Sequence, residues 1–359
     1  MTTENHSPSA AWFLWLGLPV ALTLTLVASL SSAWAESPRT LKTSPKELAA
    51  YQQAAAYSRM HRGVSMVVMK NGQIVFEDYA EGHSADEAHN LYSGTKSFSC
   101  AIAVAAIQDR LLSFDEPVAQ TITEWQADPQ KATITIRQLL TLTSGIDAGD
   151  TGSTPSYAKA VAAGMLHAPG TAFQYGPVPF QVFGELMRRK LTPTGETARD
   201  YLTRRVLTPI GSHIDTWRTT EDGYPKMSAG AFLTAREWAK YGQLMLDNGL
   251  WANKEILKKD ILAECFQGTV VNPGYGVTFW LPVNGGIDSK GGSADPSAAE
   301  LRAVGAPDVI IKAAGVGGQK LYVIPSMNLV IVRQALRLPL WGRGYQDAEF
   351  LAPIFNYGG

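Results

Sequence analysis

Hydrophobic positions near the two ends of the chain form short runs of β-branched and aromatic residues, which is typical of β-strands. Residues 64–80 read VSMVVMKNGQIVFEDYA, with one such run on each side of Asn71-Gly72. An Asn-Gly pair between two runs of this kind is the strongest short signal for a β-hairpin. A second strand pair is predicted at residues 320–336, KLYVIPSMNLVIVRQAL, around the turn sequence PSMN. Both ends of the chain therefore supply strands.

Between these strands the hydrophobic pattern is mainly helical. The longest run, SGTKSFSCAIAVAAIQDRLL at residues 93–112, is apolar and rich in Ala and Ile. Gly, Ser, Pro and Asp gather in two stretches that are predicted to be loops, at residues 144–156 and 285–296. Further helices are predicted at residues 135–142, 201–211 and 234–249, with a weaker one at 347–355.

This order of elements predicts the fold class. Strands at the two ends with helices between them do not follow the strand–helix alternation that builds a parallel sheet. We expect an α+β fold, with an antiparallel sheet made from both chain ends and flanked by helices. A mainly helical lobe is expected as an insertion at about residues 120–290, within one domain of residues 36–359.

The N-terminal segment has the pattern of a targeting signal. Residues 11–30 contain no charged residue, and Ala33 and Ala35 form an A-x-A cleavage pattern. This predicts a secretory signal peptide, residues 1–35, cleaved after Ala35. An apolar segment of this length also suffices to span a bilayer, and residues 1–10 lack Lys and Arg, so an uncleaved anchor stays open. Either alternative predicts a periplasmic or secreted domain, with membrane contact only if the segment is retained.

Composition narrows the function classes. The chain is 45% hydrophobic and 18% charged, which is typical of a globular protein. Its net charge of −1 does not favour nucleic-acid binding, which would call for a basic patch. Cys100 and Cys265 could pair in an oxidising compartment, but the apolar run around Cys100 favours a buried free thiol. No metal site is predicted, because the histidines lack a zinc-ligand spacing such as H-E-x-x-H. They are His6, His61, His83, His89, His167 and His213.

Two Ser-x-x-Lys pairs are candidates for a nucleophile and its base: Ser93–Lys96 and Ser156–Lys159. Residues three apart share a helix face, and burial lowers a lysine pKa so that the amine can accept a proton. Ser93 begins the most apolar predicted helix, whose N-terminal N–H groups would stabilise an oxyanion. Ser156 follows a polar loop, where we expect a helix N-cap and a solvated, charged Lys159. The first pair is preferred, although this spacing alone is a weak signal.

Four motifs, in this order, resemble the serine-reactive beta-lactamase superfamily. The similarity is greatest to its class C-like branch, which includes esterases and 6-aminohexanoate-dimer hydrolases. It spans about residues 50–340 and implies a two-lobed beta-lactamase/transpeptidase-like fold. The motifs are LYSGTKSF at residues 91–98, TIRQLLTLTSGI at 135–146, APGTAFQYGPVPFQVFGELM at 168–187 and GVGGQKLYVIPSMNLVIVR at 315–333.

The resemblance implies roles for individual residues. Ser93 matches the acylated nucleophile, Lys96 its base, and Tyr175 the phenol that exchanges a proton with the leaving group. A neighbouring ammonium group should make such a phenol easier to ionise. Pro177 departs from the family pattern Tyr-x-Asn or Tyr-x-Ser, because it has no side-chain group to hold Lys96. A water or another side chain would have to take that role, or Lys96 would be held less firmly.

The family's Lys-Thr-Gly motif corresponds here to IKAAGVGG. When it is aligned on Gly315, Ala313 stands in the lysine position, and Lys312 is one residue out of register and would face the other side of the strand. Because that lysine normally recognises a substrate carboxylate, beta-lactam and D-Ala-D-Ala substrates are less expected than esters and amides. The N–H of Val316 would complete an oxyanion hole with that of Ser93.

The expected function is an exported serine hydrolase that cleaves a small ester or amide through a Ser93 acyl-enzyme, with Lys96 and Tyr175 as acid–base groups and no cofactor. The alternatives are a class C-type beta-lactamase or D-peptidase, and a non-catalytic sensor of the penicillin-binding type. The residues expected to bind substrate are Gly315, Val316, Gly317 and Trp280. Tyr275 and Phe279 are further candidates, and core packing is an equal alternative for these two and for Trp280.

Overall fold

The computed structural model describes residues 43–336 and 344–357. The predicted signal peptide, residues 1–35, lies outside the described residues. In the described part of the chain, no helix combines the length and the apolar character needed to cross a bilayer.

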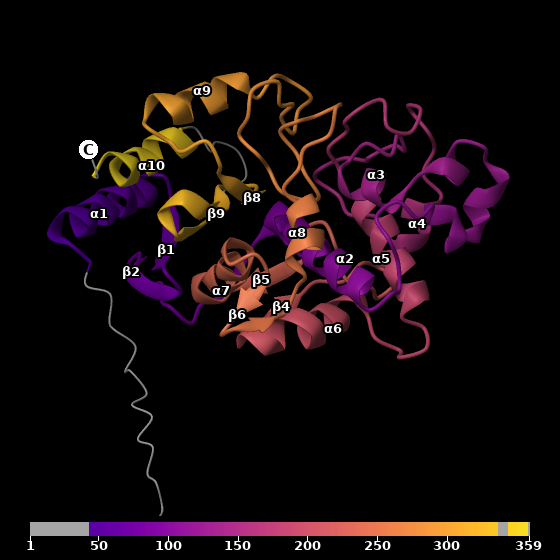
Figure 1. Cartoon of the computed structure of the whole chain (residues 1–359), viewed down its shortest axis with the longest axis horizontal. Coiled ribbons are helices and arrows are strands. Elements are labelled where there is room, and N and C mark those ends of the chain that lie inside the picture. Colours follow the sequence, from indigo (N-terminus) through magenta and orange to yellow (C-terminus); the bar gives the residue numbers. More distant parts are fainter. Residues whose placement is uncertain (1–42, 337–343, 358–359) are drawn as a thin grey trace, which may run out of the picture. The chain divides into compact units, whose positions relative to one another are not determined.

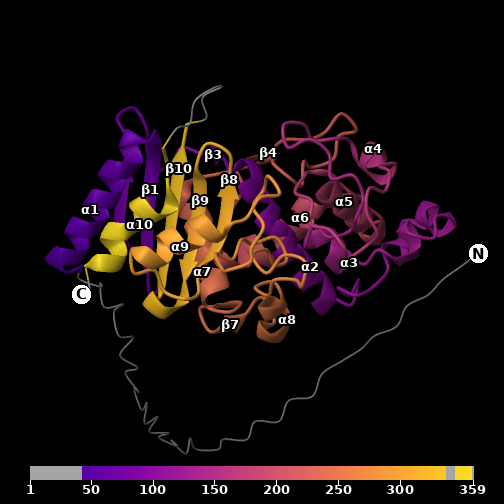
Figure 2. The same ribbon diagram turned by 90° about the horizontal axis from the view of Figure 1, so that it is seen from above.

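A five-stranded antiparallel sheet joins both ends of the domain (Figures 1 and 2), which confirms the predicted fold class. The strand order is β2-β1-β10-β9-β8, so the N-terminal hairpin lies beside the C-terminal strands. Val67 opposes Val332 where the two ends of the domain meet. The strands are β1 (Gly63–Lys70), β2 (Gln73–Tyr79), β8 (Ile311–Gly315), β9 (Gln319–Ile324) and β10 (Leu329–Ala335).

Residues with positive φ close both predicted strand pairs. Asn71 has φ = 49° and Gly72 has φ = 75°, as a two-residue primed turn requires. Asn328, with φ = 48°, ends the turn between β9 and β10 after the 3₁₀ helix η7 (Pro325–Met327). Both hairpins are confirmed, and local turn chemistry explains each of them.

The two faces of the sheet bury different helices. Met66 and Val68 of β1 contact a cluster that includes α1 (Pro45–Met60) and α10 (Asp347–Asn356). Figure 2 shows these two helices over one face of the strands. Val67 belongs to the larger core on the opposite face, where α7 (Ala235–Leu246) packs on β1, β9 and β10. The period-two alternation of β1 thus separates the two layers of the core.

Two surface helices were not predicted from the sequence. Helix α1 begins with a capping box, in which Ser44 accepts from the backbone of Glu47 and the Glu47 side chain accepts from Ser44. Its S-P-K-E start is a recognisable signal. Helix α9 (Asp295–Ala303) follows the loop that begins at residue 285 and packs against α10.

The segment that carries the first Ser-x-x-Lys pair differs from the prediction. A continuous helix was expected over residues 93–112. The chain instead forms a 3₁₀ helix, η1 (Tyr92–Ser97), followed by α2 (Phe98–Gln108). Helix α2 is buried from Phe98 to Ala106, so it forms the centre of the larger core. The 3₁₀ form moves Ser93 off the N-terminus of an α-helix.

The remaining elements lie between β2 and β8. The predicted helix at residues 201–211 is irregular: α6 gives way to one π-helical turn, Thr203–Leu207, and then to a 3₁₀ turn that contains Pro209. The boundaries of the helical lobe, about 120–290, stay a prediction. The other helices are α3 (Ile136–Leu140), α4 (Tyr157–Val161), α5 (Val178–Lys190), α6 (Ala198–Leu202) and α8 (Lys259–Glu264). Two small sheets contain β3 (His89–Asn90), β4 (Thr216–Trp217) and β5 (Ala231–Leu233), and β6 (Leu250–Trp251) and β7 (Lys254–Glu255).

Candidate active site

The 3₁₀ turn η1 brings the two predicted reactive side chains together. In a 3₁₀ helix, side chains three residues apart are eclipsed. Lys96 Nζ lies 3.0 Å from Ser93 Oγ, within hydrogen-bond distance. Tyr92, directly before the serine, has φ = 46°, an unusual conformation for a bulky residue, and its N–H donates to Asn90 Oδ1 at 2.8 Å. Backbone strain of this kind gathers at functional sites, and here it lies next to the candidate nucleophile.

Lys96 has the environment of a proton acceptor. Only 4% of the residue is exposed, and its Nζ also donates to the carbonyl oxygen of Ser228 at 3.1 Å. The rings of Tyr175 and Phe180 lie 4.8 and 5.5 Å from the amine. Among the described residues, no carboxylate forms an ion pair with it. Burial therefore lowers the pKa of Lys96 to about 7, so about half of the amine is neutral near pH 7.

The pKa of Tyr175 is shifted in the opposite direction from the one expected. Its ring lies against the amine of Lys96, but burial raises the pKa of the phenol to about 12, and a hydrogen bond with Ser93 offsets only part of that effect. The expectation of easier ionisation was wrong because desolvation of the buried phenol outweighs the interactions that favour its charged form. At neutral pH the phenol is protonated, so it can donate a proton and cannot accept one.

A backbone carbonyl takes the role that Pro177 cannot fill. Pro177 precedes α5, where its fixed φ suits a helix start. The oxygen that holds Lys96 in place belongs to Ser228, 132 residues further along the chain. No sequence motif marks this partner, because any residue offers the same carbonyl. The expected water or side chain is replaced by main chain just before β5.

The end of β8 lies directly beside this turn. A Cβ atom on Gly315 would come within 2.0 Å of the Leu91 carbonyl oxygen, so only glycine allows this close approach. Val316 and Gly317 follow in the β8–β9 turn, where Gly317 has φ = 83° and Val316 is exposed. Ala313 faces the core on the same side of the strand as Gly315. The structure thus brings the predicted oxyanion segment next to the segment that carries Ser93.

Lys312 lies on the other face of β8. Its Nζ is 2.6 Å from Asp347 Oδ2, and Lys320 Nζ is 3.0 Å from the second oxygen of the same carboxylate. Tyr322 donates to that oxygen at 2.7 Å, and these partners hold the pKa of Asp347 well below its usual range. The lysine nearest to the family's Lys-Thr-Gly position is therefore committed to a buried ion cluster away from Ser93.

Aromatic side chains form one wall of the site. Trp280 exchanges two backbone hydrogen bonds with Lys312 and so extends the edge of β8. Its ring lies 5.3 Å from that of Tyr175 and 4.7 Å from that of Tyr275, and Phe173 completes the group. Phe279 contacts Phe266 in the core. Of the three aromatic candidates, Trp280 is partly exposed at the site, whereas Tyr275, which packs against it, and Phe279 are core residues.

The second Ser-x-x-Lys pair has the predicted structural role. Ser156 is the N-cap of α4, and its hydroxyl accepts from the backbone N–H of Lys159 at 3.4 Å. The Lys159 side chain is 67% exposed and forms an ion pair with Glu221 at 2.6 Å. The two cysteines are buried free thiols, also as favoured by the sequence: Cys100 on α2 and Cys265 at the end of α8.

A family model decides the classification. The model described as "Beta-lactamase" matches residues 48–347, which is most of the chain. The chain belongs to the beta-lactamase family. The resemblance inferred from the four sequence motifs is thereby confirmed, and the family consists generally of serine hydrolases, including esterases and amidases.

Individual relatives of this beta-lactamase family member are distant. Protein flp of Staphylococcus aureus (strain MW2) is 25% identical over 179 residues, which cover 44% of this chain and only 35% of that protein. A candidate 6-aminohexanoate-dimer hydrolase from Bacillus anthracis matches with a TM-score of 0.65 at 20% identity, covering 85% of this chain and 80% of that one. A family VIII carboxylesterase matches with a TM-score of 0.65 at 18% identity, covering 88% and 97%. These two structural likenesses show a common fold.

Proposed function

We propose that this beta-lactamase family protein is an exported serine hydrolase that cleaves a small ester or amide through an acyl-enzyme on Ser93. One observation carries the proposal. A buried lysine without a carboxylate partner among the described residues lies 3.0 Å from a half-buried serine hydroxyl. A serine is a weak nucleophile at its own pKa and needs an adjacent base, which Lys96 supplies.

The first step is proton removal and attack. Neutral Lys96 takes the proton of Ser93 Oγ, and the oxygen attacks the substrate carbonyl to give a tetrahedral intermediate. The lowered pKa of about 7 leaves much of the amine unprotonated at neutral pH, while its protonated form is still a useful acid. The Ser228 carbonyl fixes the direction of the amine throughout.

The intermediate then loses its leaving group. The backbone N–H groups of Ser93 and Val316 stabilise the oxyanion, and the close contact between Gly315 and Leu91 supports this pairing. Tyr175, which is protonated at neutral pH, donates its proton to the leaving oxygen or nitrogen and regains one from Lys96. Neutral Lys96 then takes a proton from a water molecule that attacks the acyl-enzyme, and it returns this proton to Ser93 Oγ as the acid product leaves.

The surroundings of the site favour a neutral, partly apolar substrate. Lys312 is held by Asp347 on the opposite face of β8, so it offers no charge to a substrate carboxylate. The wall formed by the partly exposed rings of Tyr175 and Trp280 suits an apolar acyl or alcohol group. The similarity to a carboxylesterase and to a candidate amide hydrolase supports the same ranking. A class C-type beta-lactamase, D-peptidase or penicillin-binding sensor is the second candidate, and the family match alone favours it.

Export is proposed from the sequence of residues 11–35. The test is N-terminal sequencing of the protein from fractionated host cells. A new N-terminus at residue 36 in the periplasmic or secreted fraction supports export with cleavage. Recovery of the uncut chain in the membrane fraction supports the anchor, and recovery in the cytosol contradicts export.

Covalent labelling tests the acyl-enzyme. The full-length protein and its Ser93→Ala and Ser156→Ala variants are treated with a fluorophosphonate and examined by mass spectrometry. We expect one adduct in the unmodified protein and in Ser156→Ala, and none in Ser93→Ala. Labelling that survives Ser93→Ala contradicts the mechanism. If nothing is labelled, and a beta-lactam or a chromogenic ester is not turned over, the sensor alternative is favoured.

A further inference from the structure

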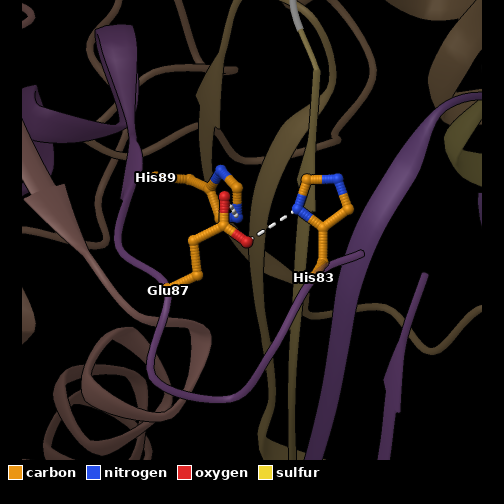
Figure 3. Close-up of side chains that lie close together, drawn as sticks. All are labelled: His83, Glu87 and His89. Carbon is orange, nitrogen blue, oxygen red and sulfur yellow. Dashed lines mark hydrogen bonds and ion pairs between the residues drawn. The ribbon is translucent and has the colours of Figure 1, made fainter. Parts of the chain in front are cut away.

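A second cluster of chemically capable side chains lies just before the nucleophile turn. His83 and Glu87 are on the loop between β2 and β3, and His89 is the first residue of β3 (Figure 3). Figure 3 shows the three side chains converging, with the carboxylate of Glu87 between the two imidazole rings. His83 Nδ1 is 2.7 Å from Glu87 Oε2, and His89 Nε2 is 3.6 Å from Glu87 Oε1.

The donor set and its spacing fit a divalent metal ion. One ligand atom from each of the three residues lies within 4.8 Å of the other two. Ligands at about 2.0–2.2 Å from a tetrahedral Zn²⁺ ion are separated by roughly 3.3–3.5 Å, so the side chains need only small movements to surround one. Two imidazoles and one carboxylate are a known zinc ligand set, which leaves a fourth position for water. Imidazole ligands favour Zn²⁺ and similar transition metals over Mg²⁺ and Ca²⁺.

An orphaned nitrogen points to the same conclusion. His89 Nε2 is completely buried and has no hydrogen-bond partner among the described residues, while its side chain is only 12% exposed. A buried polar atom without a partner normally costs stability. A metal ion between His89 and Glu87 would satisfy this atom.

We propose that His83, Glu87 and His89 form a binding site for a Zn²⁺-like divalent transition metal. Its position suggests a structural role for the ion. His89 is held in β3 by pairing with Leu233 of β5, and Ser93 follows four residues later. The metal would fasten the loop of residues 80–88 to this strand and so stabilise the segment that leads into η1.

The sequence does not predict this site, because its histidines lack a helical zinc-ligand spacing such as H-E-x-x-H. The ligands here follow the pattern H-x-x-x-E-x-H, and only the fold aligns a loop with a strand so that they meet. The competing explanation is a simple hydrogen bond between His83 and Glu87. That explanation predicts no specific uptake of metal and leaves His89 Nε2 without a partner.

Metal titration of the full chain distinguishes the two explanations. Chelator-treated protein without a histidine tag is titrated with Zn²⁺ by calorimetry and with Co²⁺ by visible absorption. We expect one ion per chain, a Co²⁺ spectrum of low coordination number and a higher melting temperature with Zn²⁺. His83→Ala and Glu87→Gln should bind at least tenfold more weakly and lose the increase in melting temperature.

Two variants serve as controls. Glu81→Gln removes the same charge from an exposed position of the same loop, and His167→Ala removes an exposed imidazole elsewhere. Both should bind like the unmodified protein. Circular dichroism of each variant without metal shows whether it is folded, and a folded site variant that binds normally contradicts the proposal. The proposal is also wrong if the unmodified protein binds no ion, or if all variants bind equally, as adventitious surface binding would predict.

Discussion

The two Ser-x-x-Lys pairs have the same residues at the same spacing, yet the fold gives them different chemistry. In the first pair, the lysine amine donates to the serine hydroxyl and to the Ser228 carbonyl oxygen, and the lysine is 4% exposed and lies beside two aromatic rings. In the second pair, the Ser156 hydroxyl accepts from the backbone of Lys159, whose side chain is 67% exposed and paired with Glu221.

The difference shows which property turns a common spacing into a reactive site. Ser156 uses its hydroxyl to cap a helix, so the oxygen is occupied by the backbone. The Lys159 side chain lies in solvent and pairs with a carboxylate, both of which stabilise an ammonium charge. Lys96 is buried and has no carboxylate partner among the described residues, and its pKa falls to about 7. Burial of the lysine without a carboxylate partner among the described residues is therefore the deciding feature.

The largest effect is expected from the two serines. Ser93→Ala should lower kcat/KM for p-nitrophenyl acetate by at least about 10⁴-fold, because removal of a nucleophile eliminates the covalent route. Ser156→Ala should keep kcat/KM within about twofold and lower the free energy of unfolding by about 1 kcal/mol through the lost N-cap. Steady-state kinetics and urea unfolding measure both. Similar losses of activity in the two variants would contradict the comparison.

The two lysines should differ by nearly as much. Lys96→Met removes the base while keeping an unbranched apolar stem, and kcat/KM should fall by about 10²–10⁴-fold. Lys159→Met removes only an exposed ion pair, and its kcat/KM should not change measurably. Circular dichroism confirms that both variants are folded. Full activity of Lys96→Met would assign the proton transfer to another group.

Tyr175 allows a sharper test of the acid role. Tyr175→Phe keeps the ring beside Lys96, Tyr275 and Trp280 but removes the proton donor. We expect kcat/KM to fall by about 10²-fold for an alkyl ester, whose leaving group needs a proton. The loss should be under about tenfold for p-nitrophenyl acetate, because nitrophenolate leaves without protonation. Equal losses for both substrates would mean that the phenol has another role.

Local signals explain how much of this arrangement the sequence predicted. The hairpins were predictable because Asn71-Gly72 and the PSMN turn define them within a few residues. Ser156 was recognisable as a cap because it follows a polar loop and precedes a short helical run. Ser93 and Lys96 were preferred because a long apolar run follows them. In each case the information lies within a short segment of the chain.

Long-range contacts explain what was missed. The 3₁₀ form of η1 accompanies a close contact between Leu91 and Gly315 on β8, which no local pattern reveals. The carbonyl of Ser228 reaches Lys96 from a distant segment and has no side-chain signature. The pKa of Tyr175 depends on how deeply its neighbours bury the phenol, so the direction of the pKa shift could not be derived from the motif.

The pH dependence follows from the lowered lysine pKa. Lys96 acts as a base only when unprotonated, so kcat/KM should rise about tenfold per pH unit up to about pH 7 and then level off. Tyr175, with a pKa of about 12, should not cause a decline below about pH 11. The pH profile of Lys159→Met should have the same inflection as the unmodified protein. An inflection near the usual lysine pKa, or none, would show that Lys96 is not the titrating base.

The smallest expected effect concerns stability. The folded-state pKa of Lys96 lies below its unfolded value, so the unfolded chain binds an extra proton between about pH 7 and the usual lysine pKa of 10.5. The penalty for burying this lysine is therefore complete below about pH 7 and disappears as the pH rises toward 10.5. Lys96→Met should increase the free energy of unfolding by about 1–2 kcal/mol at pH 7. This gain should shrink toward pH 10, whereas Lys159→Met should show no such trend. Urea unfolding at both pH values measures the difference, and a gain that does not depend on pH would mean that Met stabilises the site by packing alone.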